Sequence, residues 1–184
     1  MAHTKYSILF VILLLPFLGL GQEHEGHHEE KMPRHSIGLA LSHSFIGKGL
    51  DEEGGGRKVI TVPSWSLKYN YRFSEKWALG WHNDLLIERF VLERSEEDGG
   101  VLVRDFPIAS LIVASHSIGD KGWGIGFGAG VEWEENESFG VVRGGVEYAV
   151  ELPNEWEIVF EGNYDIIIEA YDSFTLGICI YKLF

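Results

Sequence analysis

The stretch WGIGFGAGVEWE, residues 123–134, alternates between two kinds of side chain without interruption. Apolar or aromatic residues occupy the odd positions, beginning with Trp123, and Gly or Glu occupies every even position, ending with Glu134. Successive side chains of a β-strand point to opposite faces. A period of two residues therefore predicts a strand with one apolar face and one small or polar face.

The same alternation recurs along the rest of the chain after residue 35, and no stretch there keeps the 3.6-residue period of a helix. The further runs are residues 35–46, 59–73, 77–92, 103–116, 139–152, 157–168 and 173–184. The run 103–116 is the least regular, because Pro107 and Ile108 blur its faces, and we expect a bulge or irregularity there. Eight strands, an even number, predict an all-β, antiparallel, up-and-down barrel.

The composition fits one exported β domain. The chain has 184 residues, of which 13% are aromatic, and it contains 23 Gly, both of which are typical of strands and turns. Its formal net charge of -13 argues against a nucleic-acid partner, since a phosphate backbone requires a basic stripe. Cys179 is the only cysteine, so the sequence excludes an internal disulfide.

The first residues predict an export signal. Lys5 precedes an uninterrupted apolar run at residues 8–15, and Pro16 ends that run. Small residues then suit cleavage before Gln22, and the apolar part is too short to span a bilayer comfortably as a helix. We therefore predict a signal peptide at residues 1–21, a flexible His- and Glu-rich periplasmic segment at 22–34 and an outer-membrane barrel at 35–184.

The lengths of the connections between strands also alternate. Residues 74–76, 117–121 and 153–155 are short turns, whereas residues 47–58 and 93–100 are longer, acidic and rich in Gly. Transmembrane barrels have short periplasmic turns and longer outside loops. This pattern predicts that both termini are periplasmic.

The two faces of the strands could be oriented in two ways. A soluble lipocalin-like carrier would turn the apolar face inward around a ligand, and a membrane barrel would turn it toward lipid. The glycines at positions 124, 126, 128 and 130 favour the membrane barrel, because inside a narrow lumen they leave room for long side chains from the opposite wall. Large aromatic residues near the strand ends also favour it, since interfacial belts need them: Phe73, Trp77, Trp123, Trp133, Trp156 and Phe184.

The C-terminal run resembles the assembly signal of outer-membrane barrels, with Phe184 last and Leu176, Ile178 and Ile180 at alternate upstream positions. Lys182 departs from that pattern, which usually has an aromatic residue there. The stretches LSHSFIGKG, VPSWSLKYNYRFSEKWALGWHNDLLIE, GFGAGVEWE and VVRGGVEYAVELPNEWE also resemble small eight-stranded outer-membrane barrels of Gram-negative bacteria, of the OmpX and OmpA-barrel type. The resemblance covers residues 35–184. It implies the fold, the outer-membrane location, contact with lipid and recognition of Phe184 by the assembly machinery, and it implies no activity.

Counting residue pairs outward from the short turns maps the lumen. The count places Lys68 opposite His82, Arg143 opposite Asp165, and Glu147 opposite Glu161. Eight strands enclose a space that side chains can fill, so we expect an ion-paired network that plugs the lumen. Its predicted members are Lys68, Arg72, Glu132, Arg143 and Glu161.

Acids outnumber bases in this predicted lumen, which raises the alternative of a divalent-cation site or slow cation passage. The candidate ligands are His82, Asp84, Glu88, Glu147 and Asp165. A second candidate site lies in the segment before the barrel, where His24, His27 and His28 stand among glutamates. The plain alternative for that segment is a solvated tail that has nothing to bury.

The sequence does not predict an enzyme. His43 lies between Ser42 and Ser44, and His116 between Ser115 and Ser117, but adjacent strand residues point to opposite faces and cannot meet as nucleophile and base. We expect no cofactor other than a cation. The function that the sequence favours is that of an integral outer-membrane barrel with a plugged lumen and a structural or surface-interaction role.

Overall fold

The computed structural model describes residues 34–50, 57–93, 101–134 and 137–184. The predicted signal peptide and the segment with His24, His27 and His28 lie outside the described residues and stay predictions. Among the described residues, no helix is both long enough and apolar enough to cross a bilayer.

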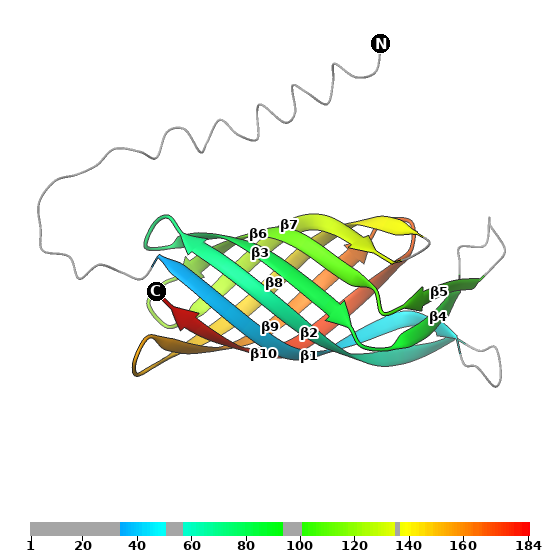
Figure 1. Cartoon of the computed structure of the whole chain (residues 1–184), viewed down its shortest axis with the longest axis horizontal. Helices are drawn as coiled ribbons and strands as arrows, with labels where there is room; N and C mark the ends of the chain where they lie inside the picture. Colours follow the sequence, from blue (N-terminus) through cyan, green and yellow to red (C-terminus); the bar gives the residue numbers. More distant parts are fainter. Residues whose placement is uncertain (1–33, 51–56, 94–100, 135–136) are drawn as a thin grey trace, which may run out of the picture. The chain divides into compact units, whose positions relative to one another are not determined.

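The described chain folds into ten antiparallel β-strands, eight of which form a closed barrel (Figure 1). The barrel strands follow one another in chain order around the wall, and pairing of the first with the last closes it. They are β1 (His35–Leu50), β2 (Arg57–Arg72), β3 (Trp77–Leu86), β6 (Ile108–Ile118), β7 (Trp123–Trp133), β8 (Ser138–Leu152), β9 (Trp156–Ile167) and β10 (Tyr171–Leu183). The other two, β4 (Arg89–Glu93) and β5 (Val101–Asp105), form a hairpin. The predicted eight-stranded up-and-down barrel is confirmed.

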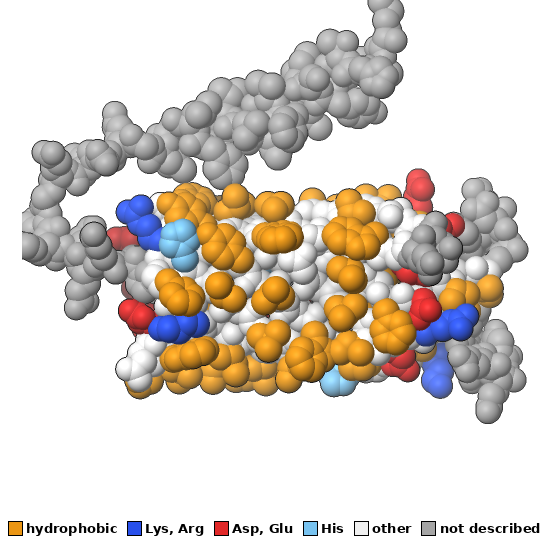
Figure 2. Space-filling model, in the orientation of Figure 1, with side chains coloured by type: hydrophobic (Ala, Val, Ile, Leu, Met, Phe, Trp, Pro, Cys, Tyr) orange, Lys and Arg blue, Asp and Glu red, His pale blue; other side chains and the backbone are white. Residues whose placement is uncertain are grey.

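The apolar face of each barrel strand points outward. Figure 2 shows hydrophobic side chains spread over the barrel wall, with the charged side chains gathered at its two ends. Phe127, for example, is 65% exposed, whereas Lys68 in the lumen is 2% exposed. An apolar outer band around a polar interior is the arrangement of a transmembrane barrel, and the opposite of a lipocalin. The lipocalin alternative is therefore wrong.

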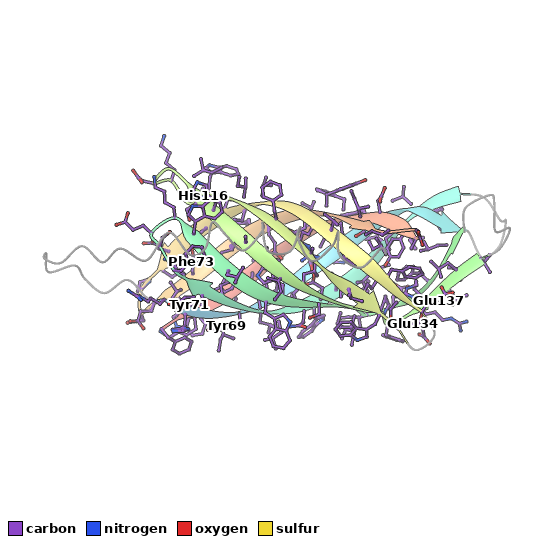
Figure 3. The ribbon with its side chains drawn as sticks, turned by 90° about the horizontal axis from the view of Figure 1, so that it is seen from above. Tyr69, Tyr71, Phe73, His116, Glu134 and Glu137 are labelled. Carbon is purple, nitrogen blue, oxygen red and sulfur yellow. The ribbon has the colours of Figure 1, made fainter. Side chains whose placement is uncertain are left out.

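The barrel has two unlike ends. We call the end with the short connections 73–76, 119–122 and 153–155, together with the C-terminal residue, the turn end; the opposite end, with the β4–β5 hairpin, is the loop end. Tyr69, Tyr71, Phe73 and His116 lie toward the turn end, whereas Glu134 and Glu137 lie at the loop end (Figure 3). Aromatic rings at the turn end form part of an interfacial belt: Trp77 contacts His116 with ring centroids 4.4 Å apart, and Trp123 contacts Tyr148 at 5.0 Å.

The predicted strands 77–92 and 103–116 are each divided in the structure, which corrects the sequence analysis. β3 ends at Leu86 because both neighbouring segments place a proline at that level. Ile87 donates its amide to the Pro63 carbonyl, and Leu86 donates to the Pro107 carbonyl, but neither proline has an amide to return. The irregularity predicted at Pro107 is confirmed, and Phe106 before it has a φ of 49°.

Candidate functional site

The lumen is the candidate functional site, and its loop end is filled by an apolar core. Side chains from the barrel wall pack there against side chains of the β4–β5 hairpin. The buried members of this loop-end core are Ile46, Val62, Leu86, Phe90, Leu92, Leu102, Ala109, Leu111, Val113, Val141, Ile167 and Tyr171. The sequence analysis expected a polar lumen throughout, so this core is a correction.

Arg104 of β5 ties the hairpin to the barrel wall. Its side chain is completely buried and lies 2.7 Å from Glu132 Oε1 and 3.1 Å from Glu134 Oε2. Glu132 also accepts a hydrogen bond of 2.7 Å from the Tyr171 hydroxyl. Glu132 was a predicted network member, but its partner Arg104 was not, because the irregular run around Pro107 left open which way Arg104 points.

Arg143 of β8 holds the middle of the lumen. Its Nε and Nη2 donate two hydrogen bonds of 2.6 Å to the two carboxylate oxygens of Asp165, and Nη2 also lies 2.6 Å from Asp84 Oδ2. A planar guanidinium suits this bidentate contact. The predicted register of Arg143 opposite Asp165 is confirmed, and the structure adds Asp84 from across the lumen.

Lys68 of β2 forms a second ion pair, with Glu161 of β9, and both side chains are buried. The predicted register of Lys68 opposite His82 is confirmed. His82 was predicted as a metal ligand, but its Nε2 forms a hydrogen bond with an amide, at 2.9 Å from Asn70 Oδ1. Asn70 was not among the predicted site residues, although it shares the lumen face of β2 with Lys68.

Little space is left around the ion pairs of Arg143 and Lys68. Two voids of about 20 Å³ each lie beside Arg143, one toward the loop end and one toward His82. A void of this size holds about one water molecule. The described side chains around Arg143 therefore leave room for about one water molecule in each of these two voids.

The turn end of the lumen is open and polar. A cavity of about 280 Å³, which we call the vestibule, is lined by Arg72 on one wall and by Glu147, Glu151 and Glu157 on the other, with His82 also among its lining residues. Glu147 stands opposite Glu161 in the strand register, as predicted, and Glu151 stands opposite Glu157. Like charges directly opposite each other destabilise a sheet, and two cations offset them here, Lys68 mainly at Glu147 and Arg72 mainly at Glu157.

The structure separates the residues that were predicted to bind a cation in the lumen. Glu88 is exposed and lies beyond the end of β3, so it does not share a face with His82 and Asp84. Asp84 and Asp165 do come together, but around Arg143, and Glu147 lines the vestibule and the small void beside Arg143. Within the described part of the chain, no group of three or more His, Cys, Asp or Glu side chains is arranged to hold a metal ion.

The atoms nearest to the lumen-facing glycines of β7 belong to the adjacent strands β6 and β8, and at Gly124 they are those of the long Glu147 side chain. A Cβ at Gly124 would lie 2.7 Å from the Glu147 carboxylate of β8, and one at Gly130 would lie 1.9 Å from the Ser110 carbonyl of β6. A Cβ at Gly126 would meet nothing closer than 3.5 Å. The glycines thus permit close approach between adjacent strands at some positions only.

Lys182, which departs from the usual assembly signal, faces outward at the turn end. Its Nζ donates hydrogen bonds to the Asn154 carbonyl at 2.9 Å and to Glu155 at 2.8 Å, and it lies over the rings of Trp156 and Phe184. A lysine can extend its ammonium group to the interface while its stem covers apolar surface. The aromatic rings on either side therefore make a lysine acceptable at this position.

The serine and histidine pairs do not form catalytic groups. Ser42 and Ser44 are buried in the lumen, where they contact Ser64 and Thr175, whereas His43 faces outward. His116 packs against Trp77 on the outside.

Comparisons with known proteins bear on the fold. No family model matches the chain, and no curated protein matches its sequence. The solved structure of the outer membrane protein AlkL in DMPC lipid bilayers is similar, with a TM-score of 0.52 and 14% identity over 90% of this chain and 97% of that chain. Neisserial surface protein A is similar with a TM-score of 0.49 and 9% identity, over 82% of this chain and 97% of that chain. Ail, the attachment invasion locus protein of Yersinia pestis, is similar with a TM-score of 0.45 and 15% identity, over 82% of this chain and 99% of that chain.

At these identities the likeness concerns the fold alone. Together, the closed strand order, the apolar outer band and the similarity to AlkL define the class: this chain has the fold of an eight-stranded outer-membrane β-barrel.

Proposed function

We propose that this protein is an integral outer-membrane barrel with a sealed lumen, and that it serves a structural or surface-interaction role without catalysis. The observation that carries the proposal is the pair of buried arginines: Arg104 at the loop end and Arg143 in the middle, each ion-paired to two carboxylates. Moving either arginine away from its carboxylates would leave buried charges uncompensated, so opening the lumen would carry a large free-energy cost.

In this proposal the turn end lies in the periplasm and the loop end faces outward. The short turns and the longer connections support that orientation, because transmembrane barrels have their short turns on the periplasmic side. Lipid would cover the apolar band, and the assembly machinery would read Phe184 and the alternating residues before it. The exposed hairpin then becomes the part available to an external partner.

The test is conductance in planar bilayers after folding has been verified by heat-modifiable mobility on a gel. A sealed barrel shifts mobility only on boiling and gives no stable conductance steps. Cation-selective steps that shrink on Asp84→Asn or Glu147→Gln would overturn the sealed lumen in favour of slow cation passage. Arg143→Gly, which removes the central side chain, provides a control for detectable opening.

Cation binding in the vestibule is a second candidate. Asp84 and Asp165 already share Arg143, whereas Glu147 and Glu157 line an open cavity and form no close ion pair with other described residues. Carboxylates in an open site suit hard cations such as Mg²⁺ or Ca²⁺, and the predicted tail histidines suit Zn²⁺, Cu²⁺ or Ni²⁺.

Calorimetric titration of each ion separates these sites. The full chain, a variant without residues 22–30 and the variant Glu147→Gln with Glu157→Gln are compared. Binding that survives deletion of the tail but is lost with the two glutamates supports the vestibule. Binding lost with the tail alone assigns the ion to the histidines, and no binding removes the candidate.

A further inference from the structure

Asn83 is a polar side chain in the apolar outer band. It alternates with Trp81 and Leu85 on the outward face of β3, and it pairs with Leu67 of β2 and Ser110 of β6 in the strand register. Its outward neighbours are large and exposed: Trp81 is 53% exposed, Leu67 58% and Ile112 54%. The amide therefore stands on the face that contacts lipid.

The Asn83 amide has no hydrogen-bond partner among the described residues. Its polar register neighbour, Ser110, accepts a hydrogen bond of 2.8 Å from the Trp81 indole. An amide has two donors and an acceptor, and leaving them unpaired in hydrocarbon is unfavourable.

The position of Asn83 along β3 keeps it away from both interfaces. It lies six residues from Trp77 at the turn end, about 20 Å along the strand, and the exposed Leu85 and Ile87 separate it from Glu88 beyond the other end of the strand. Polar headgroups and water at either boundary are therefore separated from the amide by apolar side chains of the same strand.

We propose that the face around Asn83 is the contact between two copies of this chain in the membrane, with the two Asn83 amides hydrogen-bonded to each other. An amide is self-complementary, because the donor of one copy meets the acceptor of the other about a twofold axis. A lipid chain offers neither group. The surrounding surface includes the exposed residues Trp65, Leu67, Trp81, Leu85 and Ile112, which supply apolar packing without a charge to repel the second copy.

Cysteine cross-linking in lipid vesicles tests the contact, because the native Cys179 is fully buried and leaves a single reactive thiol in each variant. Leu67→Cys, which lies beside Asn83 on β2 and keeps its amide, is compared with Phe160→Cys, which is exposed on β9, four strands from β3 on the opposite wall. We expect a disulfide-linked dimer of Leu67→Cys that persists as lipid is added, and little dimer of Phe160→Cys. Equal yields that fall together on dilution would show random collision and overturn the proposal.

A second measurement uses energy transfer between labelled copies of the otherwise native chain and of Asn83→Leu. Leucine suits a lipid-facing strand, and heat-modifiable mobility verifies that the variant folds. We expect Asn83→Leu to weaken association about tenfold, in the range measured for hydrogen bonds between membrane segments. A native chain that is monomeric, or a leucine variant that associates as tightly, would contradict the proposal. Neither outcome depends on whether the lumen conducts.

Discussion

The two halves of the lumen differ in which side chains line them and in how much space those side chains leave. The loop half is filled by a large apolar core and by Arg104, which has no exposed surface, whereas the turn half opens into a vestibule of about 280 Å³ lined by charged side chains. Both halves are built from the same alternating strands. The difference shows that an inward face can be an apolar core at one end of a barrel and a hydrated polar surface at the other.

The largest difference in unfolding free energy between the two halves is expected when Arg104→Met is compared with Arg72→Met. Arg104 is buried beside Glu132 and Glu134, so its loss leaves buried carboxylates unpaired and we expect a cost of about 3–5 kcal/mol. Arg72 lies in the open vestibule, and its loss should cost less than about 1 kcal/mol. Urea unfolding in lipid vesicles, followed by tryptophan fluorescence, measures both. Adding Glu132→Gln to Arg104→Met should recover part of the loss; equal effects of the two single variants would refute the contrast.

A matched pair of leucines tests the packing of each half. Leu86 is 7% exposed in the loop-end core, so Leu86→Ala should cost about 3 kcal/mol. Leu183 is only partly buried near the turn end, so Leu183→Ala should cost about 1 kcal/mol. The same unfolding assay compares them. If Leu183→Ala costs as much as Leu86→Ala, the turn half is as tightly packed as the loop half.

A pair of glycines on β7 sharpens the comparison further. Gly130 lies toward the loop end, where a Cβ would contact the Ser110 carbonyl, so Gly130→Ala should cost about 2 kcal/mol. Gly126 has room for a Cβ, so Gly126→Ala should change stability by less than about 1 kcal/mol, in the stabilising direction. Stability and heat-modifiable mobility of both variants decide this, and a tolerated Gly130→Ala would contradict the close approach.

The smallest effect is expected in the vestibule. Glu157 stands opposite Glu151, so Glu157→Gln should relieve repulsion and stabilise the barrel by about 0.5 kcal/mol at low salt. Because the site is open to solvent, this gain should disappear in high salt. Glu161→Gln is the contrasting variant: it deprives the buried Lys68 of its partner and should destabilise the barrel at every salt concentration.

Sequence patterns predicted the parts of this molecule that follow from local geometry. Alternation identified the strands and their faces, and counting from the turns at 74–76 and 153–155 paired Lys68 with His82 and Arg143 with Asp165. Within a hairpin the register follows from the turn, so these pairs depend on nearby residues only.

The contacts that the sequence did not predict join segments with no turn between them. Asp84 reaches Arg143 across the lumen, and Arg104 reaches Glu132 only because the chain divides at Pro107. Glu88 was assigned to the lumen by extending the alternation of β3 past Leu86, where Pro63 and Pro107 on the neighbouring segments end the strand pairing. Two prolines far apart in the sequence act at one level of the wall, which a run-by-run interpretation cannot detect.

The missing backbone hydrogen bonds at these two prolines should also divide the molecule into two regions that differ in their rates of amide hydrogen exchange. Apart from its own pairing, the β4–β5 hairpin has one register pair with the described part of the barrel, between Gly49 and Leu92. Opening the hairpin therefore breaks few backbone bonds, and its attachment depends on the buried side chains Phe90, Leu102 and Arg104. Amides of β4 and β5 should exchange with deuterium through a local opening. Amides of β1, β2 and β10 should exchange only when the whole barrel unfolds. Detaching the hairpin would separate Arg104 from Glu132 and expose Phe90 and Leu102, so buried side chains hold it in place more than backbone hydrogen bonds to the wall do.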